Sequence, residues 1–167
     1  MKNIHPKIIL LSIVMLVWSA VFGQTKLLAR NNNEYCNARY KYCIWYPRTM
    51  KAGPEAENGD GRSFSDGRSN IRVYGRGNWN EEGETLSLQE KYTEDTSEQK
   101  DRKITYSKLG KTFYVLSGNE DGRVFYQNTV QLTDAFGTAI LDYRPADSIR
   151  YKNIASLILQ NFKRAAD

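Results

Sequence analysis

The sequence predicts an α+β protein with one antiparallel sheet of five or six strands flanked by two helices. Four apolar, alternating segments follow one another between residues 103 and 143, with turn residues between them, which is the pattern of an antiparallel meander. A capping signal predicts a helix near 85–98, and an apolar stripe predicts a second helix at 147–163. A single domain of this length is long enough to bury a core of its own.

The N-terminus has the order of a secretory signal peptide. Lys2 and Lys7 flank the start of an apolar run, residues 8–17, and small side chains lead to Gly23. Cleavage after Gly23 would remove residues 1–23. The alternative is an uncleaved membrane anchor, but a bilayer span needs about 20 apolar residues and this run is shorter. We therefore expect an exported protein of the periplasm or extracellular space, with no stable membrane span after cleavage.

A disulfide-clipped hairpin is the first structure expected after the signal peptide. Residues 24–34 are polar and lack periodicity, which predicts a flexible leader ahead of a single domain, residues 35–167. Alternating aromatic residues predict a short hairpin over 35–46. Cys36 and Cys43 are the only cysteines. In an oxidising compartment such a close pair favours a disulfide over a metal site, which needs more ligands.

The next segment is rich in turn residues. Glycine, proline, Asp, Asn and Ser predict a long loop over 51–69, followed by a short strand, 70–74. A second glycine-rich loop contains Trp79. Ser87 and Glu90 have the spacing of a capping box, which predicts the start of the first helix.

The second half of the chain predicts a sheet covered on both faces. The expected strands are 103–108, 111–117, 123–132 and 136–143. Two of them are apolar on both faces, so we expect a packing layer on each side. Asp147 or Ser148 could cap the last helix. Its apolar stripe, predicted to pack on the sheet, consists of Tyr151, Ile154, Ala155, Ile158 and Phe162.

Charge and histidine content exclude several classes of function. The chain has 24 Lys and Arg against 19 Asp and Glu, and removing the signal peptide removes two of the lysines and no acid. Bases alternate with acids over 81–103, which does not favour a nucleic-acid surface. His5 is the only histidine and leaves with the signal peptide. The mature chain then has no imidazole for a catalytic triad, a Cys-His pair or a histidine-ligated metal.

An aromatic cluster is the candidate binding surface. Half-buried strands select such residues for packing, so a core role is favoured for the cluster and binding is the alternative. Trp79 differs from the others because it lies in a glycine-rich loop, where packing demands less. The cluster consists of Tyr40, Tyr42, Trp45, Tyr46 and Trp79.

Acidic segments give weaker candidates. Asn58, Asp60 and Asp66 offer oxygen donors for a cation, but Arg62 occupies a donor position of a calcium loop, so structural turns are favoured. A run of glutamates offers carboxylates of the kind that a glycosidase pairs, but a run within a loop shows no defined separation between them. These residues are Glu81, Glu82 and Glu84.

Several short segments resemble a group of uncharacterised exported bacterial proteins. They are Lys-Tyr-Cys-Ile-Trp-Tyr-Pro at 41–47, Asn-Gly-Asp-Gly-Arg-Ser-Phe at 58–64, Arg-Val-Tyr-Gly at 72–75 and Phe-Tyr-Val-Leu-Ser-Gly at 113–118. The order of strands and helices over about 35–162 resembles the PsbP/Mog1-like sheet-and-helix sandwich. The resemblance implies a non-enzymatic domain that binds or assists other proteins, and it carries over no site residues.

These observations together predict an exported, non-catalytic binding or accessory protein of the bacterial cell envelope. Its expected partner is another envelope or extracellular protein, and we expect no cofactor and no nucleic acid. The first alternative is a glycan or small-molecule binder that uses the aromatic cluster. A more distant alternative is a histidine-free hydrolase that relies on carboxylates.

Overall fold

The computed structural model describes residues 31–165, with the exception of the Leu159 side chain. The predicted signal peptide, residues 1–23, and most of the predicted leader lie outside the described residues. Residues from Glu34 onward belong to one compact unit. Within 31–165, no helix is both long and apolar enough to cross a membrane.

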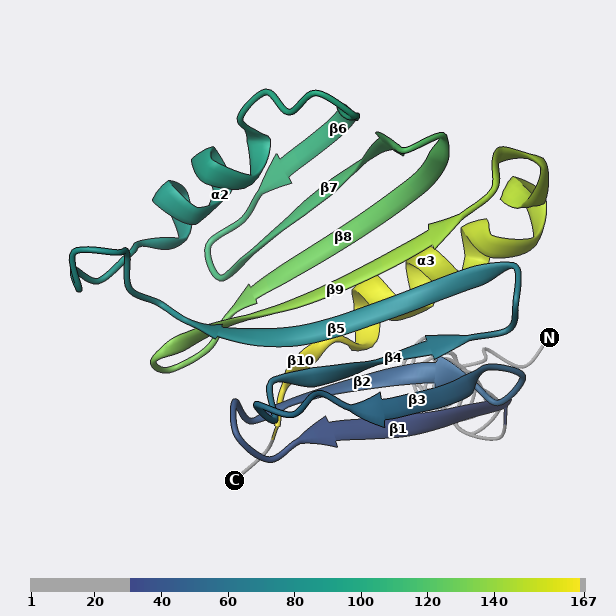
Figure 1. Cartoon of the computed structure of the whole chain (residues 1–167), viewed down its shortest axis with the longest axis horizontal. Coiled ribbons are helices and arrows are strands. Elements are labelled where there is room, and N and C mark those ends of the chain that lie inside the picture. Colours follow the sequence, from purple (N-terminus) through teal and green to yellow (C-terminus); the bar gives the residue numbers. More distant parts are fainter. Residues whose placement is uncertain (1–30, 166–167) are drawn as a thin grey trace, which may run out of the picture. The chain divides into compact units, whose positions relative to one another are not determined.

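The described part contains two antiparallel sheets. The large sheet has seven strands in the order β3-β4-β5-β9-β8-β7-β6, and the small sheet has three in the order β1-β2-β10 (Figure 1). The expected single sheet of five or six strands is therefore wrong. The α+β class and the antiparallel pairing are confirmed.

The small sheet contains the predicted hairpin. It is formed by β1 (Asn32–Asn37), β2 (Tyr42–Pro47) and the short β10 (Lys163–Arg164), which pairs with β2. β1 begins inside the predicted leader, residues 24–34. The disulfide between Cys36 and Cys43 joins β1 to β2, as the sequence predicts.

The predicted loop 51–69 is instead a hairpin. It forms β3 (Lys51–Glu55) and β4 (Gly61–Ser65), and β4 pairs with β5 (Ser69–Gly77). The sequence pattern does not reveal these strands, because Phe64 is the one apolar residue of β4. In β3 only the central residue is partly buried, and the other four are exposed. β5 also extends past the predicted 70–74, because its two glycines continue the pairing with β9.

The meander agrees closely with the prediction. Its strands are β6 (Arg102–Leu109), β7 (Phe113–Glu120), β8 (Arg123–Gln131) and β9 (Ala135–Tyr143). Strand β9 is central, and all nine of its residues are buried.

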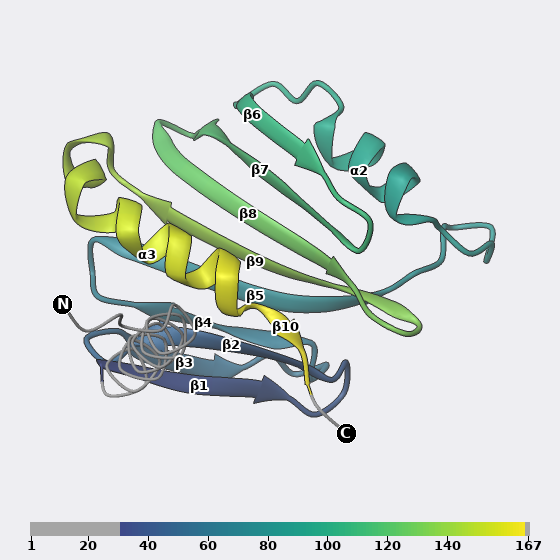
Figure 2. The same ribbon diagram turned by 180° about the vertical axis from the view of Figure 1, so that it is seen from behind.

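Each face of the large sheet carries one helix. Helix α3 (Ser148–Asn161) follows the 3₁₀ turn η1 (Pro145–Asp147) and lies along β9 on one face (Figure 2). Its stripe packs as predicted into the larger core, with Tyr151, Ala155, Ile158 and Phe162 all buried. Asp147 precedes the helix, but its side chain makes no capping hydrogen bond.

Helix α2 (Leu88–Thr96) contributes to the core on the opposite face. Its N-terminus has the predicted capping box, in which Ser87 and Glu90 bond each other's backbone amides. This smaller core is formed by Leu88 and by sheet residues Tyr114, Leu116, Phe125, Phe136 and Ile140.

Candidate functional site

The candidate site is a hollow of about 320 Å³ where three turns and the C-terminal strand meet. The β1–β2 turn contributes Arg39, Tyr40 and Lys41, and the segment after β5 contributes Trp79. The β8–β9 turn contributes Asp134 among others, and β10 contributes Arg164. We call it the Trp79 hollow.

Hydrogen bonds and the disulfide fix the β1–β2 turn. Cys36 and Cys43 clamp its base, with their Cα atoms 4.1 Å apart. Asn37 accepts a bond from the Tyr40 backbone amide (2.7 Å) through Oδ1 and donates through Nδ2 to the Gly59 carbonyl (2.9 Å). Lys41 adopts a left-handed backbone conformation, φ 55°, and its amide bonds the Asn37 carbonyl. The three side chains of this turn that line the hollow are therefore presented by a constrained loop.

Two glycines of β5 let the aromatic rings of Tyr40 and Trp79 pack directly against the backbone of the strand. A Cβ added at Gly75 would lie 2.3 Å from ring carbons of Tyr40, and one at Gly77 would lie 2.2 Å from ring carbons of Trp79. Glycine in a strand interior often marks such close approach. The Gly-Arg-Gly segment, residues 75–77, was not used to predict this site, although it could have indicated it because alternate residues of a strand face the same side.

Trp79 combines a fixed position with high exposure. Its ring packs over Gly77, yet 55% of the residue's surface is exposed to solvent. Trp79 forms a bridge with Thr85, and the neighbouring Asn78 amide bonds the Asp134 carbonyl (3.3 Å). An exposed aromatic ring on a braced loop is typical of a recognition surface.

Three cationic residues line the Trp79 hollow together with the two rings. The Arg39 guanidinium lies 5.0 Å from the centroid of the Tyr40 ring, an arrangement that permits a cation–π interaction. Arg39 also donates to the Asn58 carbonyl. Asp134 is the one acid among the lining residues, against Arg39, Lys41 and Arg164. Sequence reasoning missed these charged residues because they come from segments that only the fold brings together.

The other members of the aromatic cluster lie elsewhere. Tyr42 is fully buried, and its hydroxyl donates to the Asp60 carbonyl (2.8 Å). Burial raises the pKa of its hydroxyl well above the ordinary value. This corrects the assignment of Tyr42 to an exposed surface. Tyr46 stacks on Phe64 at 4.0 Å between ring centroids, and the Trp45 indole donates to Glu34 (2.9 Å).

The three weak metal candidates do not come together. Asn58 and Asp60 bond each other in the turn between β3 and β4. Asp66 lies in the turn at the other end of β4. Its carboxylate accepts bonds from the Tyr151 hydroxyl (2.6 Å) and from the Arg68 and Ser69 amides. These residues form structural turns, which was the favoured interpretation.

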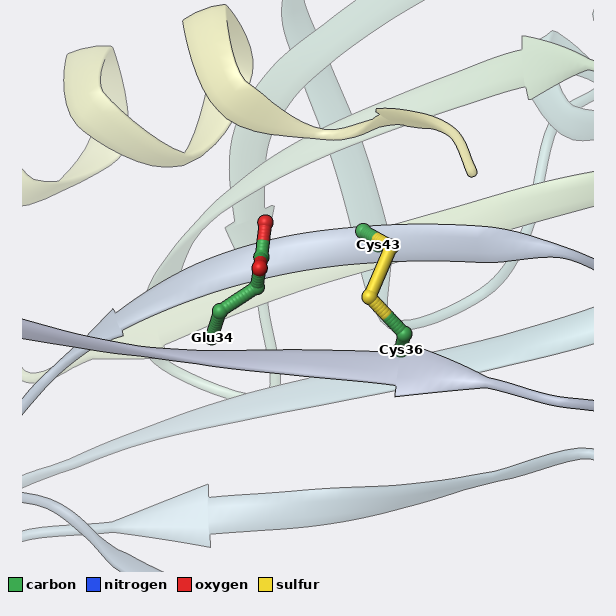
Figure 3. A group of neighbouring side chains, drawn as sticks. All are labelled: Glu34, Cys36 and Cys43. Atoms are coloured by element: carbon green, nitrogen blue, oxygen red, sulfur yellow. A yellow bond between two sulfur atoms is a disulfide. The ribbon is translucent and has the colours of Figure 1, made fainter. Parts of the chain in front are cut away.

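Glu34, Cys36 and Cys43 form the one group of three metal-ligating residue types found within the described residues. Their ligand atoms lie within 4.8 Å of one another. Figure 3 shows the two sulfur atoms joined to each other and Glu34 beside them. Disulfide sulfurs are not thiolates, which are the form that binds metals. The Glu34 carboxylate accepts the hydrogen bond from the Trp45 indole, so the three residues connect β1 to β2.

A charged cluster beneath α2 bears on the hydrolase alternative. Asp95 accepts bonds from Lys91 (2.5 Å), from Gln127 (2.7 Å) and from the Tyr114 hydroxyl. Burial and the nearby Asp95 charge raise the pKa of Tyr114. Asp95 does not line the Trp79 hollow. These bonds fasten α2 to the sheet.

The glutamates of the 78–86 loop do not form a paired-carboxylate site. Glu81, Glu82 and Glu84 are exposed, and Glu84 accepts a bond from Asn80 (3.2 Å). None of the three lines the Trp79 hollow.

Comparison with known proteins supports the fold. No family model and no curated protein matches the chain. The solution structure of cyanobacterial PsbP (CyanoP) from Synechocystis sp. PCC 6803 matches with a TM-score of 0.58 and 15% identity, covering 80% of this chain and 92% of that one. A crystal structure from Bacteroides thetaiotaomicron VPI-5482 matches with a TM-score of 0.49 and 9% identity, covering 82% of this chain and 50% of that one.

The chain therefore has a PsbP-like fold, which confirms the resemblance in strand and helix order. At this identity the likeness concerns the fold alone, since one fold hosts many functions. It assigns no role to the residues of the Trp79 hollow.

Proposed function

We propose that this protein is an exported, non-catalytic binding module of the cell envelope and that the Trp79 hollow is its recognition site. One observation carries the proposal. The rings of Tyr40 and Trp79 pack directly against two alternate glycines of β5 in the large sheet, while 55% of the surface of Trp79 stays exposed. A rigid aromatic anchor costs little conformational entropy on binding, which favours recognition.

The disulfide supports the export part of the proposal. Disulfides persist in oxidising compartments outside the cytoplasm and are rare inside it. The Cys36–Cys43 bond also clamps the turn that carries Arg39, Tyr40 and Lys41. Export would thus complete the binding site as well as stabilise the fold.

Packing roles for the perturbed titratable groups support the non-catalytic part. Burial raises the pKa of Tyr42, Tyr114 and Tyr143, the last to about 12, and all three are core residues. Catalytic groups with shifted pKa values normally line a cleft. None of these tyrosines lines the Trp79 hollow.

Site-specific crosslinking in the native cell tests the proposal. A photoreactive phenylalanine analogue would replace Trp79 in one variant and Ile149, which is 95% exposed at the start of α3, in a matched control. We expect a discrete crosslinked protein from position 79 and none from position 149. Equal crosslinking at both positions, or none at 79, would contradict the proposed site.

A substrate panel tests the absence of catalysis. The full chain, recovered after export from an expressing bacterium, would be assayed with esterase, glycosidase, peptidase and phosphatase substrates, with and without divalent metals. We expect no turnover above that of a mock purification. Turnover abolished by replacing one Asp, Glu, Ser or Lys would overturn the proposal.

Glycan binding is the second candidate function, and the exposed Trp79 ring favours it specifically. Sugar rings stack on such aromatic faces, and the hollow volume lies at the lower end of the range for small-ligand sites. A panel of neutral oligosaccharides separates the two candidates. Binding that is lost in W79A and insensitive to salt would favour the glycan.

A further inference from the structure

A second hollow adjoins the Trp79 hollow and shares one of its cations. It has a volume of about 310 Å³ and is lined by Phe113, Val130, Phe162 and Lys163, among others. Arg164 lines both hollows. Because Lys163 and Arg164 form β10, the two hollows meet along this short strand.

Cations dominate the lining of the two hollows. Arg39, Lys41, Lys163 and Arg164 contribute positive charge, and Asp134 is the one acid among the lining residues. Lys41 and Lys163 are exposed to solvent. The chain as a whole is far more balanced, with 24 bases and 19 acids, so this surface concentrates positive charge.

The second hollow continues onto an exposed part of the sheet. A bulge between Ile104 and Tyr106 shifts the register of β6, so that Tyr106 pairs with Ser117 and Lys108 with Val115. These positions share the face of Phe113, because alternate residues of β7 point the same way. Tyr106 is 53% exposed and Phe113 38%.

We infer that the two hollows form one docking surface for an extended, acidic peptide segment of a partner protein that also carries aromatic or apolar side chains. The inference rests on the proposed function and names its partner's chemistry. Positive charge complements the acids of such a segment, and the exposed rings take its apolar side chains. Two adjoining hollows of this size can each accept a side chain of an extended peptide that crosses β10.

The charge distribution disfavours larger polyanions. Exposed glutamates lie on the loop that carries Trp79, beside the cationic residues, so a membrane or a nucleic acid would also meet negative charge. These residues are Glu81, Glu82 and Glu84. A peptide covers only the cationic strip and avoids them.

Selection from a phage-displayed library of random 12-residue peptides tests the inference. The bait is the full chain recovered after export. We expect recovered peptides to be enriched in Asp, Glu and aromatic residues relative to the starting library. For a synthesised representative, we expect the Kd to rise at least tenfold between 50 and 500 mM NaCl, since screening weakens exposed ion pairs.

Charge reversal then locates the surface. The variant K41E/K163E changes two exposed lysines of the surface, and we expect at least a tenfold rise in the Kd for the same peptide. The matched control K51E/K152E reverses two exposed lysines in β3 and in the first turns of α3, which line neither hollow, and should stay within twofold. Thermal unfolding checks that both variants fold. If K41E/K163E fails to fold, the salt dependence of the unmodified chain still decides.

Several outcomes would overturn the inference. They are no enrichment, enrichment of neutral or basic peptides, salt-independent binding, or equal losses in the two double variants. Binding to phosphatidylglycerol vesicles that K41E/K163E abolishes, without acidic peptides in the selection, would assign the surface to lipid instead. If crosslinking from position 79 persists in any of these cases, the proposed function stands and only the acidic partner fails.

Discussion

Asp66 shows at the scale of a single residue how an apparent ligand serves the fold. Its Oδ2 accepts the Tyr151 hydroxyl bond at 2.6 Å, and its Oδ1 accepts the Ser69 amide at 2.9 Å. Tyr151 comes from α3, so the bond ties the helix to the turn between β4 and β5. Burial alone would raise the pKa of Asp66, but the bonds from Tyr151, Ser69 and Arg68 outweigh it and lower the pKa to about 2.

The lowered pKa of Asp66 predicts that the free energy of unfolding falls in acid. Because the folded pKa lies below the ordinary 3.8, the Asp66 carboxylate stabilises the fold above about pH 4, and this contribution disappears as the pH falls toward 2. Because the carboxylate is partly exposed and water screens its interactions, the contribution at neutral pH is on the order of 1 kcal/mol. We expect the difference in unfolding free energy between the native chain and D66N, measured with urea, to shrink between pH 4 and pH 2.

The variant Y151F tests whether the hydrogen bond from Tyr151 helps to lower the pKa of Asp66. It removes one donor to Asp66 and should move the loss of stability to higher pH. A difference that stays constant down to pH 2 would show that the Asp66 carboxylate contributes no such stabilisation.

The aromatic residues show what a sequence reveals about single positions. Alternation identified the strand that contains Tyr42 and Trp45, but alternation cannot say which face is buried. Tyr42 lies in the core and Tyr40, two residues earlier, lines the Trp79 hollow because a turn separates them. Trp79 stood out in the sequence because it is a large aromatic residue in a glycine-rich loop. It is the most exposed member of the predicted aromatic cluster.

At the scale of elements, regular patterns were readable and polar strands were not. The capping box at Ser87, the stripe of α3 and the four meander strands agree with the prediction. The β3–β4 hairpin was missed because its residues are mostly polar and include Pro54. Pro54 and a bulge lie in the edge strand β3, features that protect sheet edges from pairing with other chains. The same composition that marks a protected edge thus resembles a loop.

The β1–β2 hairpin gives a prediction about its disulfide. The bond between Cys36 and Cys43 closes a loop of about eight residues, which the chain-entropy model values at about 2.5 kcal/mol. We expect C36A/C43A to lower the unfolding free energy by about that amount. We also expect weaker binding at the Trp79 hollow, because Arg39, Tyr40 and Lys41 lose the clamp at the base of their turn.

Mass spectrometry and urea unfolding together test the disulfide. Peptide mapping of the exported protein should show Cys36 joined to Cys43. Two free thiols in that sample, or a loss below about 0.5 kcal/mol in C36A/C43A, would contradict the prediction.

At the scale of the whole molecule, the central strand β9 separates two cores of unequal size. The larger core lies on the α3 face and includes Ile158, and the smaller one lies on the α2 face and includes Leu88. The sequence predicted cover on both faces from strands that are apolar on both sides. It could not predict the small sheet, because the pairing of β10 with β2 joins segments about 120 residues apart, a contact that local patterns do not encode.

The unequal cores predict that α2 opens without the rest of the fold. This helix has nine residues, and Leu88 is its one buried apolar side chain. Although its undocking must break the bonds from Asp95 to Gln127 and Tyr114, we expect a local opening that costs less free energy than global unfolding. Amides of β9 should exchange only through global unfolding. I158A, which truncates a fully packed residue, should cost about 3 kcal/mol. It should therefore speed exchange in β9 roughly 100-fold and leave α2 unchanged, because the Ile158 contacts persist when α2 opens.

Hydrogen exchange followed by mass spectrometry measures both segments at once. L88A serves as the matched variant: it weakens the docking of α2, and every state in which α2 is released, including the unfolded state, becomes more accessible by the same factor. Exchange should then rise equally in α2 and in β9. If I158A instead accelerates α2 as strongly as β9, the helix opens only with the whole sheet, and the two faces form one cooperative unit.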